Sequence, residues 1–250
     1  MITIKGPDDF ARMRHAGKAV AQVHREVRAA AAPGVSLLDL EDIAAKVIAD
    51  AGCMPSFLNY SEPPYPATTC MSVNDEIVHG IPSKRQLKDG DILSLDAGAI
   101  YEGWHADAAV TFGIGEVSDE AAQLMEVTER AMWEAIELCT PGTRLGDLGH
   151  RISSVAEPHG YGVVREYTGH GIGMQMHEEP QILNYGRPGK GFKLRKGMAI
   201  CIEPMFNLGT HETRVREDLW TVVTADGSLS AHFEHTIAIT PDGPEVLTAG

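Results

Sequence analysis

Apolar residues recur at helical spacing near the start of the chain. Phe10, Met13 and Val20 belong to an alanine-rich stretch with few helix-breaking residues, and Pro33-Gly34 closes that stretch. Recurrence every three or four positions is typical of one buried helix face. The pattern therefore predicts a long helix over residues 7–32.

A second stretch of the same kind follows at once. Ser36 is suited to cap a helix, because its side-chain oxygen can accept a hydrogen bond from a free backbone N–H group. Leu40, Ala44 and Val47 continue the helical spacing until Gly52. We expect a second helix between these two ends.

The rest of the chain alternates between strand-like and helical patterns. Residues 57–69 are rich in Pro and Tyr and predict a loop. Short apolar runs predict strands around residues 70–73, 91–99 and 105–112. Helical spacing returns at about residues 118–139 and 144–158, and strand and turn patterns follow to the end of the chain.

Two parts of the chain repeat the same order of features. Residues 33–40 and 141–148 share Pro, Gly, Leu, Asp and Leu in register. In each part, an apolar run then leads from a glycine to an acidic residue, from Gly90 to Asp96 and from Gly197 to Glu203. His105-Ala106-Asp107 likewise resembles His232-Phe233-Glu234. We expect a single domain of residues 1–250, built from two related halves of about 1–115 and 116–250, whose matched carboxylates converge.

Composition and charge narrow the class of protein. The 250 residues are 43% hydrophobic and 22% charged, which is ordinary for a globular domain. The net charge of −14 argues against direct nucleic-acid binding, because a polyanion requires a basic face. A neutral or cationic small substrate fits this charge better.

The expected compartment is the cytoplasm. The chain lacks a signal-like apolar start and any run of about 18 apolar residues that could span a membrane. Its four cysteines form no CxxC pair and are expected to be reduced thiols. They are Cys53, Cys70, Cys139 and Cys201.

Acidic residues inside apolar strands are the main chemical signal. Asp96, Asp107, Glu203 and Glu234 all occur in such settings, and a buried carboxylate is costly unless a cation neutralises it. Two divalent ions would neutralise all four, with His170 as a nitrogen ligand. Exposed strand ends, or ion pairs with Lys and Arg residues at the turns, are the alternatives.

The type of donor favours particular metals and a particular reaction. Oxygen ligands with one imidazole suit Mn, Fe, Co or Zn, whereas calcium sites use consecutive loop acids. A pair of such ions can activate water and polarise a carbonyl, which indicates amide hydrolysis. His170 lies between glycines in Gly169-His170-Gly171, where backbone or substrate can approach closely.

Several motifs together resemble the type I methionine aminopeptidases, whose pita-bread fold is shared with prolidases and creatinases. The resemblance covers nearly all of the chain and implies an α+β fold with a curved antiparallel sheet, outer helices and an inner metal site. The motifs are Val78-His79-Gly80-Ile81-Pro82, Asp91-Ile92-Leu93-Ser94-Leu95-Asp96, His105-Ala106-Asp107, Thr168-Gly169-His170-Gly171-Ile172-Gly173, His177-Glu178-Glu179-Pro180, Ile202-Glu203-Pro204-Met205 and Phe233-Glu234-His235-Thr236.

The resemblance also implies which residues hold two divalent metals. Asp96 would bind one ion, and His170 and Glu203 the other. Asp107 and Glu234 would bridge the two. This ligand set agrees with the one expected from the buried charges.

Two histidines gain roles from the same resemblance. His79 would contact the peptide beyond the scissile bond, and His177 would hydrogen-bond the carbonyl oxygen and stabilise the tetrahedral intermediate. Glu203 is one candidate acceptor for the proton of a metal-bridging hydroxide. A purely structural role is the alternative for both histidines.

The substrate pocket departs from the family pattern in two places. Tyr65, Cys70 and Trp220 match pocket positions, and Tyr60 is expected to join them. The loop before Tyr65 is longer, with Phe57 or Leu58 where many relatives have cysteine. Met176 replaces a common aromatic residue. Ordinary core packing is the alternative for each aromatic side chain.

The expected function is removal of N-terminal methionine before a small second residue. N-terminal peptides, including nascent chains at the ribosome, are the expected partners of a monomeric enzyme. One alternative is an Xaa-Pro aminopeptidase, although such relatives usually carry a large domain where this chain has roughly ninety residues before Asp96. The other is a non-catalytic peptide-binding relative, which would be expected to have lost ligands.

Overall fold

A computed structural model describes residues 2–249. One large antiparallel sheet forms its centre, in the strand order β1-β4-β5-β14-β9-β7-β8, with β2 beside β4 and β15 beside β14. These strands are β1 (Met54–Pro55), β2 (Thr69–Val73), β4 (Ile92–Tyr101), β5 (Trp104–Gly113), β7 (Gly169–Gly171), β8 (Glu178–Ile182), β9 (Ala199–Ile202), β14 (Glu234–Thr240) and β15 (Gly243–Val246).

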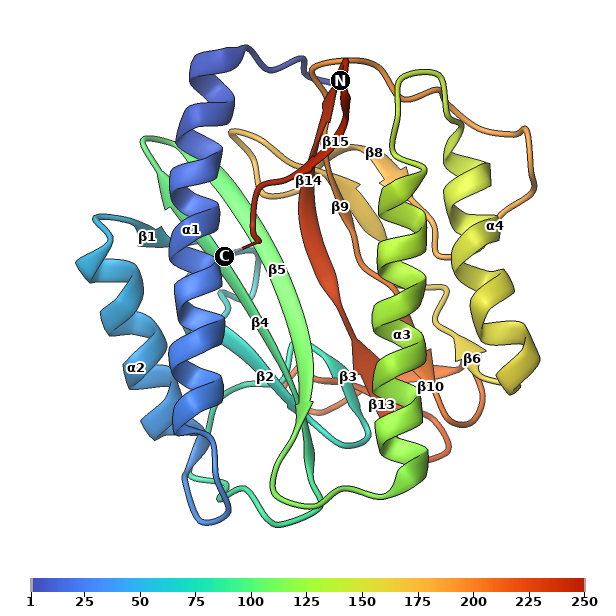
Figure 1. The fold of residues 1–250 in the computed structure, drawn as a ribbon. Coiled ribbons are helices and arrows are strands. Elements are labelled where there is room, and N and C mark those ends of the chain that lie inside the picture. The colour runs from blue at the N-terminus through green and yellow to red at the C-terminus, as the bar shows by residue number, and fades with distance from the viewer. Residues whose placement is uncertain (1, 250) are drawn as a thin grey trace.

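Four helices cover one face of this sheet, as Figure 1 shows. They are α1 (Pro7–Ala30), α2 (Leu37–Asp50), α3 (Asp119–Glu137) and α4 (Leu145–Ala156), which continues into a 3-10 turn at Glu157–His159. α1 packs on β4 and β5, and α3 packs on α4 and the C-terminal strands. All four lie close to the predicted ranges, which confirms the helices expected from the apolar periodicity.

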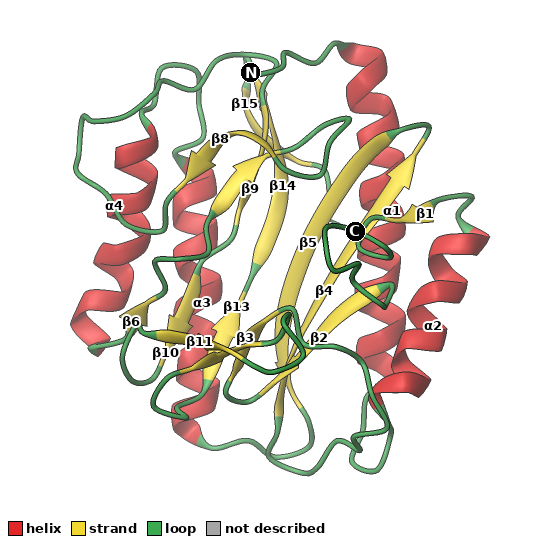
Figure 2. Ribbon diagram, turned by 180° about the vertical axis from the view of Figure 1, so that it is seen from behind, coloured by secondary structure: helices red, strands yellow, loops and turns green. Residues whose placement is uncertain are grey.

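Two small sheets lie beside the large one in Figure 2: the first packs against α3 and α4, and the second lies on the face away from the helices. They have the orders β13-β10-β6 and β11-β12-β3. Their strands are β3 (Glu76–Val78), β6 (Gly162–Val163), β10 (Met205–Asn207), β11 (Thr213–Val215), β12 (Val222–Thr224) and β13 (Ser230–His232). The sheet is therefore covered by helices on one side and by short strands and loops on the other.

Side-chain alternation along β4 assigns the two faces of the sheet. Leu93, Leu95 and Ala97 are fully buried in the same apolar cluster as the inner sides of α1 and α2. Asp96 lies between two of them and therefore projects toward the opposite face. The long strands thus bury one face under helices and direct acidic residues to the other.

Local sequence accounts for the start of α2. The Ser36 hydroxyl accepts a hydrogen bond from the Asp39 amide at 3.2 Å, and the Asp39 carboxylate accepts from the Ser36 amide at 3.2 Å. This reciprocal arrangement satisfies two backbone donors that the first helical turn leaves free. The predicted cap at Ser36 is confirmed. No helix within residues 2–249 has the length and apolar character needed to cross a bilayer.

Candidate metal centre

Three acidic side chains lie in a row on the sheet face opposite the helices. Asp96 in β4 is paired with Ala109 in β5, and Ala109 is paired with Glu234 in β14. Directly paired residues project to the same face, and so does Asp107, two positions before Ala109. The pairing therefore brings carboxylate oxygens of Asp96, Asp107 and Glu234 within 4.8 Å of one another.

His170 and Glu203 lie beside this row. His170 Nε2 is 3.5 Å from Glu203 Oε1 and 3.9 Å from Glu234 Oε1. The flanking glycines make this approach possible. A Cβ on Gly169 would lie 2.4 Å from the Cys201 carbonyl oxygen, and one on Gly171 would lie 2.2 Å from the Glu179 carbonyl oxygen. Neighbouring backbone atoms occupy the space that a side chain would need at these two positions.

Burial sets the protonation of the acidic cluster. Burial, and then the charges of neighbouring carboxylates, raise the pKa of Asp96 and Glu234 well above their usual range. Burial likewise raises the pKa of Asp107 to about 7. No Lys or Arg within residues 2–249 forms an ion pair with any of these three acids or with Glu203, so the ion-pair alternative has no support.

Several buried polar atoms of the cluster lack a hydrogen-bond partner among the described residues. They are Asp96 Oδ1, Asp107 Oδ1, Glu234 Oε1 and His232 Nε2. Buried polar atoms are almost always paired, so unpaired carboxylate oxygens that converge on one spot indicate a cation-binding site. Oxygen donors with imidazole fit divalent metals.

His232 is a member of this site that we did not predict as a ligand. It lies in β13, 2% exposed, and its Nε2 is 3.7 Å from Glu203 Oε2. Together with Glu203 and Glu234 it forms a second group of convergent donors. The sequence holds one signal, since His232-Phe233-Glu234 matches His105-Ala106-Asp107, but that match indicates related halves and not a ligand.

His177 lies against both His170 and the Tyr60 loop. Its ring centroid is 4.3 Å from that of His170, and its Nδ1 is 2.6 Å from the Tyr60 hydroxyl oxygen. Burial lowers the pKa of His177. A neutral imidazole with one nitrogen held by a hydroxyl can direct the other nitrogen to a ligand.

His79 lies on the other side of the cavity with a left-handed backbone, at φ 59°. Its ring makes edge-to-face contacts with Tyr167 and Trp220, at centroid distances of 5.6 and 6.0 Å. Burial lowers its pKa to about 4, so the ring is neutral at pH 7.

Aromatic side chains form the apolar wall. Tyr65 contacts Trp220 edge-on at 5.1 Å and Phe57 at 6.5 Å. Phe57 is 4% exposed and Leu58 is 43% exposed, so Phe57 is the one of the two that lines the wall. Cys70 and Met176 complete the same apolar cluster.

One cavity of about 170 Å³ collects all twelve residues that the sequence predicted for the site. Asp96 and Glu203, the matched carboxylates of the repeat, both line it, while the division into two related halves stays a prediction. The lining also includes residues that were not predicted. These are Phe57, Ser61, Val78, Tyr167, Thr168 and His232.

Comparison with known proteins agrees with this geometry. The model of metallopeptidase family M24 matches residues 11–241. Over 249 residues the chain is 49% identical to a methionine aminopeptidase of Clostridium acetobutylicum, with 99% of each chain covered. It is 46% identical to methionine aminopeptidase 1 of Bacillus subtilis, again with 99% of each chain covered.

Solved structures show the same relation. A methionine aminopeptidase from Thermotoga maritima superimposes with a TM-score of 0.98 at 47% identity, with both chains fully covered. A prolidase from Pyrococcus furiosus shares the fold alone, with a TM-score of 0.80 at 21% identity over 99% of this chain and 65% of that one. The predicted α+β pita-bread fold is confirmed.

Proposed function

Because the chain belongs to metallopeptidase family M24, we propose that it is a methionine aminopeptidase that releases N-terminal methionine before a small second residue. One observation carries this proposal. The candidate metal ligands, two neutral histidines and an aromatic wall all line the same cavity. A peptide end bound there would have its first side chain beside the wall and its first amide bond beside the acids.

We assign the ligands of a metal pair as the sequence motifs suggest. Asp96 would hold one ion, His170 and Glu203 the other, and Asp107 and Glu234 would contact both. Two divalent ions, of Co, Mn, Fe or Zn, would polarise the scissile carbonyl and lower the pKa of the attacking water. Glu203 would accept the proton that this water loses.

His177 is assigned to the carbonyl oxygen of the substrate. We assign the Tyr60 hydroxyl as the donor to Nδ1, an assignment that leaves the ring proton on Nε2. This Nε2–H group would donate to the carbonyl oxygen as negative charge develops there. A well-placed donor of this kind is worth about 100-fold to 1000-fold in rate. His79 would contact the peptide beyond the scissile bond.

The cavity wall suits a methionine side chain. Tyr60, Tyr65, Cys70, Met176 and Trp220 present aromatic and sulfur-containing surface, and contacts between sulfur and aromatic rings add about 0.3–1.5 kcal/mol each. The surrounding acids would attract the free amino group of the substrate, which favours cleavage at the peptide end.

We also propose a setting for this activity. The enzyme would act as a cytoplasmic monomer on N-terminal peptides, including nascent chains at the ribosome. Support comes from its four cysteines, all free and buried, which fits a reducing compartment.

The test is methionine release from a Met-Ala-Ser peptide by metal-stripped protein to which Co, Mn, Fe or Zn is returned. Release should require metal and be lost in Glu203→Ala, whereas Glu126→Ala, which removes an exposed acid of α3, should match the parent. Cleavage of an Xaa-Pro peptide instead would support the rival peptidase. Failure to cut either peptide with any metal would refute the proposal.

A further inference from the structure

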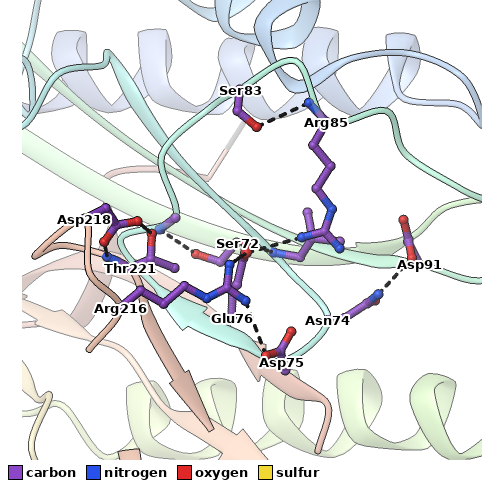
Figure 3. A network of polar contacts seen from close by, with 12 residues as sticks. Ser72, Asn74, Asp75, Glu76, Ser83, Arg85, Asp91, Arg216, Asp218 and Thr221 are labelled. Atoms are coloured by element: carbon purple, nitrogen blue, oxygen red, sulfur yellow. Dashed lines mark hydrogen bonds and ion pairs between the residues drawn. The ribbon is translucent and has the colours of Figure 1, made fainter. Parts of the chain in front are cut away.

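A buried carboxylate outside the metal centre accepts hydrogen bonds from three segments of the chain. Glu76 in β3 is 6% exposed. Its Oε2 accepts a hydrogen bond from the Val73 amide at 2.8 Å, and its Oε1 accepts from Arg85 at 3.2 Å and from Arg216 at 2.6 Å. Figure 3 shows the two arginines converging on Glu76.

The two arginines belong to segments that line the proposed substrate cavity. Glu76 lies three residues before His79, and Arg85 lies six residues after it. Arg216 begins the turn of residues 216–221 between β11 and β12, and this turn carries Trp220. Glu76 therefore connects the segment of His79 with the turn of Trp220.

The turn has its own internal hydrogen bonds. The Asp218 carboxylate accepts from the Trp220 amide at 2.9 Å and from the Thr221 amide at 2.8 Å, and the Arg216 amide donates to the Thr221 carbonyl at 2.8 Å. Figure 3 shows Asp218 bonded to Thr221. These bonds fix the shape of the turn, because they join residues of the turn to one another. They do not fix the position of the turn relative to β3.

Backbone pairing provides only part of that placement. β12 pairs with β3 at Val222–Val78 and Val223–Glu76, and the register shifts between these two pairs. The ladder is thus irregular just after the turn ends. The Arg216 side chain spans this irregularity, with one guanidinium nitrogen on Glu76 and another 3.4 Å from Asp75.

We propose that Arg216 is a positioning residue, which acts through Glu76 to hold Trp220 against His79 and so to shape the site for the substrate peptide. The two rings are in edge-to-face contact, and both line the cavity. Arg216 itself does not line the cavity. It lies outside the acidic cluster, so its loss should alter peptide binding and leave metal binding intact. The effect on peptide binding rests on the proposed aminopeptidase function.

The kinetic experiment compares Arg216→Ala with Arg214→Ala in the metal-loaded enzyme. Arg214 is an exposed residue of β11, two positions earlier, and forms no ion pair with any residue of the 2–249 segment. For a Met-Ala-Ser peptide, Arg216→Ala should raise KM about tenfold and leave kcat within about twofold, as expected when binding is lost and chemistry is retained. Glu76→Gln should cause the same change, Arg216→Lys should restore part of the loss, and Arg214→Ala should match the parent.

A second readout does not depend on turnover. In a Trp104→Phe/Trp133→Phe background, Trp220 is the only tryptophan. Adding Arg216→Ala to this background should shift Trp220 emission to longer wavelength and increase its quenching by acrylamide, and adding Arg214→Ala should do neither. If the parent enzyme releases no methionine, the proposed function fails and the Trp220 measurement still decides the placement.

Two results would overturn the inference. In one, Arg216→Ala lowers the unfolding temperature but leaves both KM and Trp220 quenching unchanged, which would mean that the arginine serves stability alone. In the other, Arg216→Ala lowers kcat together with metal content, which would mean that the turn supports the metal centre.

Discussion

At the scale of single residues, the hydrogen bond between Tyr60 and His177 bears on which tautomer the imidazole adopts. With the Tyr60 hydroxyl assigned as the donor to Nδ1, 2.6 Å away, Nε2 carries the remaining ring proton. Tyr60→Phe keeps the aromatic surface and removes only this donor. The ring could then adopt either tautomer and would donate to the substrate for only part of the time.

We expect Tyr60→Phe to lower kcat about tenfold, the lower end of what groups that orient a working imidazole contribute. KM for a methionyl peptide should change little, because the ring of Tyr60 remains. Steady-state kinetics of the metal-loaded enzyme measure both values. Tyr185→Phe, at a half-exposed ring outside the cavity, is the matched control. An unchanged kcat in Tyr60→Phe would remove the positioning role of the phenol.

Sequence alone predicted the residues whose chemistry conflicts with their setting. Asp96 and Glu234 stand out because acids rarely occur in apolar strands, and the motifs identified His177. The chemistry of His232 does not conflict with its setting in this way, since a histidine in a buried strand is common, and its match to His105 does not by itself indicate a ligand. Phe57 and Leu58 could not be separated either, because only the backbone path of the loop decides which one reaches the cavity.

At the scale of elements, His24 ties α1 to the sheet. It is partly buried, and its Nε2–H group donates to the Ala108 carbonyl of β5 at 3.0 Å. Burial, followed by the nearby His235, lowers the pKa of His24 to about 3. The unfolded chain therefore takes up this proton near pH 6.5 and the folded chain only near pH 3. Proton linkage gives the direction of the effect. Above pH 6.5 the lowered pKa of His24 does not change the free energy of unfolding, and below pH 6.5 it lowers that free energy progressively.

We therefore expect His24→Leu to flatten the pH dependence of the free energy of unfolding. Between pH 7 and 5.5 the parent should lose about 1 kcal/mol more than the variant, since one proton contributes up to about 1.4 kcal/mol per pH unit. Urea unfolding at several pH values gives this difference. His150→Leu, at an exposed position of α4, should keep the parental slope. Parallel curves for His24→Leu and the parent would contradict the assignment.

The elements differ in how well sequence predicts them. The four helices and the long strands β4 and β5 were predicted because their apolar periodicity extends over ten residues or more. The small sheet of β3, β11 and β12 was not, since each strand has three residues and its partners come from distant segments. No local pattern records a pairing between Val78 and Val222. The position of His79, directly after β3, and that of Trp220, between β11 and β12, both depend on this sheet.

At the scale of the whole molecule, helices cover one face of the large sheet (Figures 1 and 2). The acidic cluster projects from the other face. The residues of the cluster come from β4, β5, β7, β13 and β14 and from the link between β9 and β10. Ions bound by all of them would link the segments before residue 115 to those after it. Metal binding should therefore affect the stability of the entire chain and not of one loop.

The direction in which the unfolding temperature changes tests this link. Without metal, the crowded carboxylates oppose folding. With metal at about 100 times its dissociation constant, the native state gains about 2.7 kcal/mol, which corresponds to a rise of roughly 5–10 °C in the unfolding temperature of a chain this size. Glu234→Gln removes one buried charge and one ligand. It should therefore raise the unfolding temperature of the metal-stripped protein and reduce the increment that metal adds.

A structural role for Glu234 predicts a different result, namely that both forms of the variant lose stability together. Calorimetry of stripped and metal-loaded samples separates the two cases. Glu126→Gln, at the exposed face of α3, should leave both temperatures as they are in the parent. Because the two expected changes in Glu234→Gln have opposite signs, general damage to the fold cannot imitate them, and their joint appearance would identify Glu234 as a ligand on which the stability of the loaded molecule depends.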